Sequence, residues 1–141
     1  MRKQILVEYL TFFILGMLIL NVMVYYYMES IRAINDMNHD KYQISFLAYS
    51  LLAVALGILI EWQKLKIIFI KKPSVNWLLL PSLFLLIASL IPMTFYVNFF
   101  GLGDPWGFHA LRWIISPLRD TVITHISINI LSGILLVRSL T

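Results

Sequence analysis

Residues 103–125, GDPWGFHALRWIISPLRDTVITH, place two Asp, two His and two Arg within an otherwise apolar sequence. His109 and Arg112 are three residues apart, so they share one face of a short helix. Arg119 and Asp120 follow in the first turn of the next predicted helix. A guanidinium group binds phosphate oxygens in a fork that a lysine cannot reproduce. One interpretation of this group of side chains is therefore a site for a phosphate-bearing lipid headgroup or a polyprenyl phosphate.

The same stretch also carries side chains that anchor a protein at a membrane surface. Trp106 and Trp113 are of the type that lies at headgroup depth. We therefore interpret the charged residues first as an interfacial belt, in which the Arg side chains pair with nearby acids or with lipid. A membrane enzyme that acts on a lipid-linked substrate at the outer surface is an alternative. Its catalytic residues would come from Asp104, His109, Arg112, Arg119, Asp120 and His125.

A second polar group lies within the last apolar segment. At about 100° per residue, His125 and Asn129 fall on one stripe of a helix, together with Thr121 and Ser132, and Gly133 lies at its edge. We interpret this stripe as hydrogen bonding and close packing between helices. The alternative is a proton-carrying or ligand-binding His125, as in a small transporter or channel component. The opposite, lipid-facing side is predicted to hold Ile123, Ile126, Ile130, Ile134 and Val137.

Several classes of chemistry have no support in the sequence. The chain has no Cys, so disulfides, thiolate metal sites and Cys nucleophiles are excluded. The motifs of phosphate-binding loops, zinc proteases, serine hydrolases and dinucleotide-binding folds are missing. The sequence therefore predicts no cofactor and no metal, and it favours a non-enzymatic function. The net charge of +4 is small and scattered, so no nucleic-acid partner is expected.

The composition predicts a protein that lies in a membrane. Apolar residues make up 60% of the chain and charged residues 13%, whereas soluble domains are about a quarter charged. The N-terminal residues MRKQILVEYLTFFILG resemble a signal peptide, but Glu8 interrupts the apolar run. No small-residue cleavage site follows. We therefore interpret this segment as a retained first span.

The apolar segments predict an all-α fold, an integral membrane four-helix bundle in a single transmembrane domain over residues 1–141. A short interfacial or re-entrant helix is expected at about 105–116, between spans 3 and 4. The four spans are predicted at about 5–27, 42–63, 75–99 and 117–139.

Local signals set the expected ends of these helices. Asp40 is the predicted N-cap of the second span, after a polar connection from Met28 to Lys41. Residues 64–71 either continue that span or lie along the interface, and Pro73 ends them. Pro92 should kink or locally unwind the third span, with Thr94 re-bonding a freed carbonyl.

The predicted function is that of a small multi-pass membrane protein, an accessory or partner-binding subunit of a membrane complex. The expected partners are membrane lipid and either other membrane subunits or further copies of the chain. Ala53 and Gly57 form a small-xxx-small pair that permits close backbone approach between helices. Glu8 lies near one end of its span, where Lys3 or a lysine of the second loop could pair with it.

The basic residues predict a cell-membrane orientation with both termini cytoplasmic. Four spans place seven Lys and Arg on the N-terminal side and four on the other (Arg32, Lys41, Arg112 and Arg119). Cysteines introduced at Asn38 and Gly103 should therefore react with an impermeant thiol reagent added to intact cells. A cysteine at Gln63 should not react. Labelling at Gln63 alone would reverse the orientation.

Overall fold

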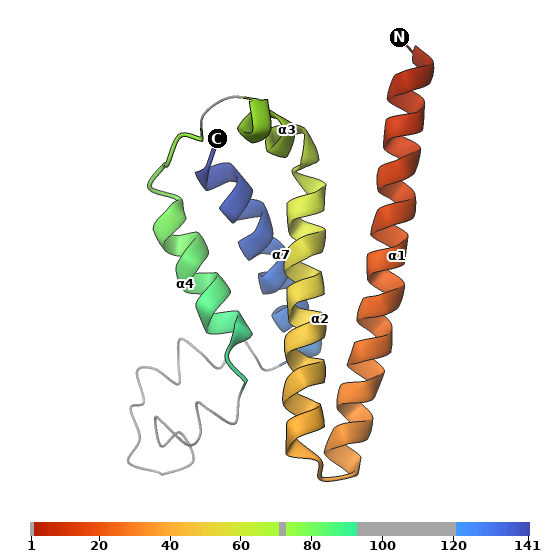
Figure 1. Cartoon of the computed structure of the whole chain (residues 1–141). Coiled ribbons are helices and arrows are strands. Elements are labelled where there is room, and N and C mark those ends of the chain that lie inside the picture. The colour runs from red at the N-terminus through yellow and green to blue at the C-terminus, as the bar shows by residue number, and fades with distance from the viewer. Residues whose placement is uncertain (1, 71–72, 93–120) are drawn as a thin grey trace.

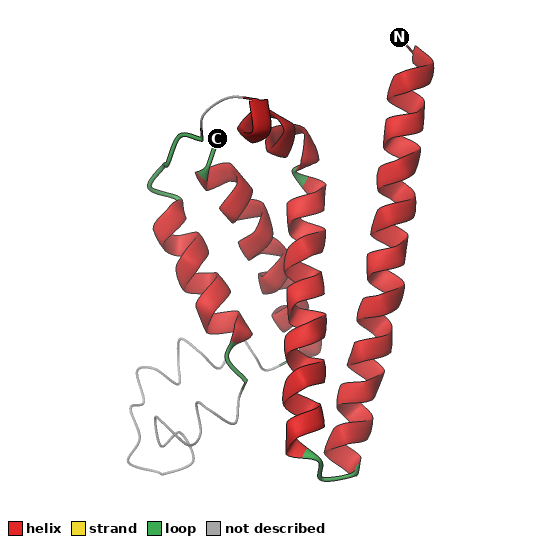
Figure 2. Ribbon diagram, in the orientation of Figure 1, coloured by secondary structure: helices red, strands yellow, loops and turns green. Residues whose placement is uncertain are grey.

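The computed structural model describes residues 2–70, 73–92 and 121–141, which form helices joined by turns and loops (Figure 1, Figure 2). These residues contain no strand, so the predicted all-α fold is confirmed. The helices are α1 (Arg2–Asn35), α2 (His39–Ile60), α3 (Trp62–Ile70), α4 (Leu79–Leu90) and α7 (Val122–Ser139).

Three helices are long and apolar enough to cross a membrane, as expected of a membrane protein. They are Leu6–Asn35, His39–Ile60 and Val122–Ser139. The predicted third span, 75–99, is described only as far as Pro92, and its helix α4 is shorter, with 12 residues. The predicted helix at 105–116 lies outside the described residues.

The first helix is longer than predicted, because polar residues after Met28 remain helical instead of forming a connection. Glu29 accepts from Arg32 one turn later at 3.0 Å, and Lys41 approaches its other carboxylate oxygen at 2.7 Å. These ion pairs stabilise the last turns of α1 and hold the start of α2 beside them. Helix α1 ends where Met37 adopts a left-handed φ of 53°.

The N-cap of α2 is Asn38, and the prediction of Asp40 was wrong. The Asn38 side chain accepts from the backbone N–H of Lys41 at 3.1 Å. Both residues are of a type that caps helices, but Asn38 directly follows the left-handed turn at Met37 and so is the first residue in position to cap. Asp40 instead lies in the first turn, where a negative charge suits the helix dipole.

The second span ends at Glu61, which separates α2 from α3. Residues 62–70 form a helix of their own that bends away from α2 in Figure 1. Burial raises the pKa of the Glu61 carboxyl, but hydrogen bonds from Arg138 and Lys64 outweigh this and hold the pKa below its ordinary value of 4.5. The Arg138 Nε lies 2.6 Å from Oε1, and the Lys64 Nζ lies 3.3 Å from Oε2. Glu61 thus ties the end of α2 to the end of α7.

Helix α4 stops before Pro92, in agreement with the predicted loss of regular helix near this proline. Its last helical residue is Leu90, and Ile91 has an extended backbone with φ −76° and ψ 120°, the conformation favoured before a proline. Thr94 lies outside the described residues.

At the other end of α4, the preceding loop closes the end of α7. The N–H of Asn76 donates to the Ser139 carbonyl at 2.8 Å, satisfying a group that a helix terminus leaves unbonded.

Helix α2 is the centre of the arrangement. It lies between α1 on one side and α7 on the other, and α7 also packs against α4 (Figure 1). The buried cluster between α1 and α2 consists of Met23, Phe46, Tyr49 and Ala53. Helix α1 packs along α2 and reaches the start of α3 through the ring contact of Phe12 with Trp62, 4.5 Å between centroids.

The described glycines mark a close backbone approach where α2 and α7 cross. A Cβ atom added at Gly57 would lie 2.1 Å from the Ile130 carbonyl oxygen, and one added at Gly133 would lie 2.3 Å from the Val54 carbonyl oxygen. Real Cβ atoms do not approach so closely, and these neighbours are backbone atoms that cannot turn aside. Because Ala53 is also fully buried, the predicted close approach at Ala53 and Gly57 is confirmed.

Substitution at this crossing should destabilise the fold. Gly133→Ala must push α7 from α2, and we expect it to lower the free energy of unfolding by about 1–3 kcal/mol, the usual cost of overpacking. Gly16→Ala is the matched control, because its Cβ would meet only the Leu59 side chain at 3.7 Å. Thermal unfolding in mild detergent measures both. Equal stability of the two variants would contradict the crossing.

Candidate functional site

The described part of the predicted site is built on the first turn of α7. Thr121 is the N-cap of this helix, and its hydroxyl accepts from the Thr124 N–H at 3.2 Å while Thr124 bonds back. His125 therefore lies one turn inside the described helix, and its side chain is 5% exposed. The residues between Pro117 and Asp120, where the sequence predicts the start of this span, lie outside the described residues.

Two polar side chains converge on one ring nitrogen of His125. The Ser50 hydroxyl oxygen from α2 lies 2.9 Å from Nε2, and the Asn129 amide nitrogen lies 3.1 Å from the same atom. The Asn129 amide N–H and the Ser50 hydroxyl can both donate to Nε2 in the tautomer that carries the ring hydrogen on Nδ1. Ser50 and Asn129 are themselves fully buried.

Aromatic rings enclose the imidazole on the α2 side. The Phe46 ring lies 4.9 Å from the His125 ring at 33°, and the Tyr49 ring lies 5.9 Å away at 82°. These ring contacts and the hydrogen bonds to Ser50 and Asn129 hold the imidazole in the packed interface of α2 and α7.

One atom of this cluster is left over. The Asn129 Oδ1 is buried and accepts no hydrogen bond from the described residues, although amide carbonyls in protein interiors are usually bonded. The described residues contain no group of three His, Cys, Asp or Glu side chains that could hold a metal ion. Within the described residues, the Asn129 Oδ1 is thus an acceptor that this cluster does not use.

The structure brings together only part of the predicted site. His125 and Asn129 share a buried stripe with Ser132 and Gly133, as predicted. The other candidates lie outside the described residues and remain predictions: His109, Arg112, Arg119 and Asp120. Sequence reasoning missed Ser50, which is 75 residues away from His125. Its one local signal is its spacing from Ala53 and Gly57, with which it shares the buried side of α2.

The prediction of a lipid-facing side of α7 was partly wrong. Val137 is 2% exposed, and Ile126 and Ile130 pack against the cluster between α1 and α2, whereas Ile123 is exposed as expected. At 100° per residue, Ile126 and Ile130 lie only 100–140° from His125. Since α7 packs against both α2 and α4, its buried arc is wide enough to include them.

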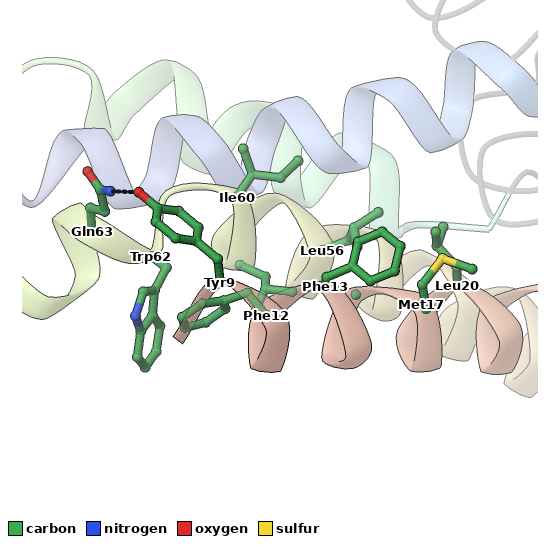
Figure 3. A pocket seen from close by; sticks show the side chains of 11 residues that line it. Tyr9, Phe12, Phe13, Met17, Leu20, Leu56, Ile60, Trp62 and Gln63 are labelled. Carbon is green, nitrogen blue, oxygen red and sulfur yellow. Dashed lines mark hydrogen bonds between the residues drawn. The ribbon is translucent and has the colours of Figure 1, made fainter. Parts of the chain in front are cut away.

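A second candidate site, which sequence reasoning missed, lies between α1 and the end of α2 (Figure 3). It is a groove of about 420 Å³. Most of its lining is apolar: Tyr9, Phe12, Phe13, Gly16, Met17, Leu20, Leu56, Leu59, Ile60, Trp62 and Gln63. Four of these residues also line an adjoining hollow of about 330 Å³, which adds Glu8 and Lys66.

The predicted pairing of Glu8 with a second-loop lysine is confirmed at this hollow. Lys66 binds Oε1 of Glu8, and the Trp62 indole N–H donates to the same oxygen at 3.3 Å. Gln63 donates to the Tyr9 hydroxyl at 3.1 Å (Figure 3). An apolar groove thus ends at a polar group of side chains.

Comparison of the chain with protein-family models, with curated proteins and with solved structures gives no match.

The role of His125 can be separated from its packing by two substitutions. His125→Leu leaves the Ser50 hydroxyl and the Asn129 amide without their shared partner, and we expect a loss of about 1–3 kcal/mol in unfolding free energy. His125→Asn keeps a polar group and should retain most of the stability and the capture of the membrane partners that the sequence predicts. Thermal unfolding and cross-linking in membranes measure the two properties. A His125→Asn protein that folds and assembles normally but has lost its function in cells would instead make His125 a proton or ligand group.

Proposed function

We propose that this chain is a multi-pass membrane protein that serves as an accessory, partner-binding subunit, and that it associates through α1 with a second copy of itself. One observation carries the proposal. The Asn21 amide is exposed within an apolar side of α1 that no other described helix covers.

Helix α1 has two distinct sides. The side toward α2 holds its less exposed residues at alternating spacings of four and three: Phe12, Gly16, Ile19, Met23, Tyr26, Ser30 and Ala33. The opposite side, which we name the free face of α1, repeats the same spacing with residues that are all exposed. They are Val7, Thr11, Ile14, Leu18, Asn21, Tyr25 and Met28. A four-three repeat is the seam along which two helices pair in a coiled coil.

Asn21 gives this face a polar group that its own helix cannot satisfy. One amide N–H donates to the Met17 carbonyl at 2.9 Å. The second N–H and the Oδ1 atom remain, and in hydrocarbon an unbonded amide group is costly. By contrast, the single hydroxyl hydrogen of Thr11 is already donated to the Val7 carbonyl at 2.8 Å.

A second copy of α1 is the partner that fits Asn21. An amide carries both a donor and an acceptor, so two Asn21 side chains related by a two-fold axis satisfy each other. A single Asn in an apolar seam also fixes the register of the two helices. The aligned neighbours Ile14, Leu18 and Tyr25 then pack across the same axis.

The cell-membrane location with both termini cytoplasmic is part of this proposal. Basic residues that the count assigns to the cytoplasmic side gather at one end of the described bundle. There, Lys64 and Arg138 share Glu61, and Lys66 binds Glu8. An excess of Lys and Arg at one membrane surface is typical of the cytoplasmic side.

A transport role is the second candidate, favoured by the buried polar cluster. His125, Ser50 and Asn129 lie within predicted spans, and the Asn129 Oδ1 has no hydrogen-bond partner in the part of the chain that the structure describes. Polar groups placed within a membrane span are the usual elements of an ion or proton path. Loss of function in the His125→Asn protein described above would favour this candidate.

The association is tested by replacing Asn21. Asn21→Leu removes the exposed amide, and we expect weaker self-association by about 3- to 30-fold, because a hydrogen bond between membrane helices contributes about 0.6–2 kcal/mol. Energy transfer between labelled copies, measured while lipid dilutes them in vesicles, reports the change. Thr11→Val is the matched control on the same face, and it should associate as the wild type does. Unchanged association of the Asn21→Leu protein would remove the basis for the proposal.

A further inference from the structure

The groove between α1 and α2 has the shape of a site for an amphiphile. Its apolar part runs from Leu20 and Met17 on α1 to Ile60 on α2 (Figure 3). The groove ends at Tyr9, beside the polar side chains of Gln63 and Glu8. Its volume of about 420 Å³ lies in the range of small-molecule sites, about 300–1,000 Å³. Gly16 leaves room in the groove because it has no side chain, and the nearest atom to the position of its missing Cβ is a Leu59 methyl carbon.

The polar end of the groove carries one charge of each sign. Lys66 and the Trp62 indole N–H both bond to Oε1 of Glu8, so Oε2 of Glu8 and two ammonium hydrogens of Lys66 are left for a ligand. Both side chains are part-exposed, at 40% for Glu8 and 44% for Lys66. A carboxylate in this position repels an anionic headgroup, whereas a headgroup with both charges matches the pair.

We propose that this groove binds one acyl chain of a zwitterionic aminophospholipid, with the ammonium of its headgroup at Glu8 and its phosphate at Lys66. Bilayer chains are as apolar as the groove, so burial of the acyl chain alone gives no preference over the surrounding lipid. Selection comes from the headgroup, and the groove fixes where the headgroup lies. The Trp62 ring suits this depth, because indole side chains prefer the membrane interface.

This site is independent of the proposed pairing of α1. Gly16 and Tyr9 lie on the side of α1 toward α2 and α3, whereas Asn21 lies on the free face. A bound lipid therefore leaves the Asn21 amide open to a second copy, and a substitution at Gly16 does not alter the free face.

Native mass spectrometry of the full chain tests the proposal. The protein is reconstituted in nanodiscs of equimolar phosphatidylethanolamine and phosphatidylglycerol, and the retained lipids are counted. We expect the wild type to retain phosphatidylethanolamine in preference by about tenfold. The double substitution Glu8→Gln with Lys66→Gln should bring this preference close to one. Gly16→Phe, which fills the groove, should remove the retained lipid while thermal unfolding shows the fold intact.

Three results would overturn the proposal. They are equal retention of both lipids by the wild type, a preference for phosphatidylglycerol, and full retention of phosphatidylethanolamine by a folded Gly16→Phe protein. If Gly16→Phe does not fold, Met17→Trp replaces it, because Met17 lines the groove and is 47% exposed, so that a larger ring there need not displace α2. Retention of phosphatidylethanolamine by the Met17→Trp protein at the wild-type level would then decide against the groove.

Discussion

The contact of Gly57 with Gly133 determines the register of α2 and α7, and the candidate site depends on that register. Three contacts follow one another along these two parallel helices: Ser50 with His125, Gly57 with Gly133, and Glu61 with Arg138. The seven residues from Ser50 to Gly57 and the eight from His125 to Gly133 rise by nearly the same length, about 10–12 Å. The glycines bring the backbones together, and the Ser50 hydroxyl can then reach the imidazole without an intervening side chain. A bulkier residue at the crossing would separate a hydrogen bond that lies two turns away.

Most buried polar side chains in the described helices are serines whose hydroxyl groups bond within their own helix. Ser82 and Ser89 on α4 are seven residues apart, as are Ser132 and Ser139 on α7. Each hydroxyl donates to a carbonyl three residues earlier in its own helix, at 2.7–3.0 Å. Such a serine is polar in sequence but needs nothing from its neighbour, so two helices can approach closely there. His125 differs, because its partner Ser50 is on another helix. Their hydrogen bond can form only when α2 and α7 lie in this one relative position.

Sequence periodicity predicted what depends on a single helix. The 100° rule placed His125, Asn129 and Ser132 on one stripe, and the small-residue spacing identified Gly57 as a point of close approach. Ser50 could not be found in this way, since its contact with His125 depends on how far α2 is shifted along its axis relative to α7. The residue pattern of one helix does not contain that information. The error at Val137 has a similar origin: one stripe was expected to face the bundle, but α7 packs against both α2 and α4. The cap of α2 was misplaced because two Asx residues compete there, and the turn at Met37 decides between them.

In a bilayer, an exposed polar group that lacks a hydrogen bond is costly, whereas in water it is not. The cost depends on how many of its donors and acceptors its own helix can bond. Thr11 and Ser127 are both exposed on apolar helices, and each donates its one hydroxyl hydrogen to its own backbone, at 2.8 Å and 2.7 Å. Hydrocarbon around them therefore meets no free donor. Asn21 has two hydrogens and a strong acceptor, and the helix can take only one of the hydrogens. Water would satisfy the rest at no cost, but lipid chains cannot, so the amide stabilises whatever neighbour offers it a matching group. The same helix meets α2 along its other side, where the buried Ser30 hydroxyl donates to the Tyr27 carbonyl of α1 itself at 2.7 Å. Side-chain packing thus holds one side of α1 against α2. In the proposed function, the N–H and Oδ1 of Asn21 that α1 does not bond hold its other side to a second copy.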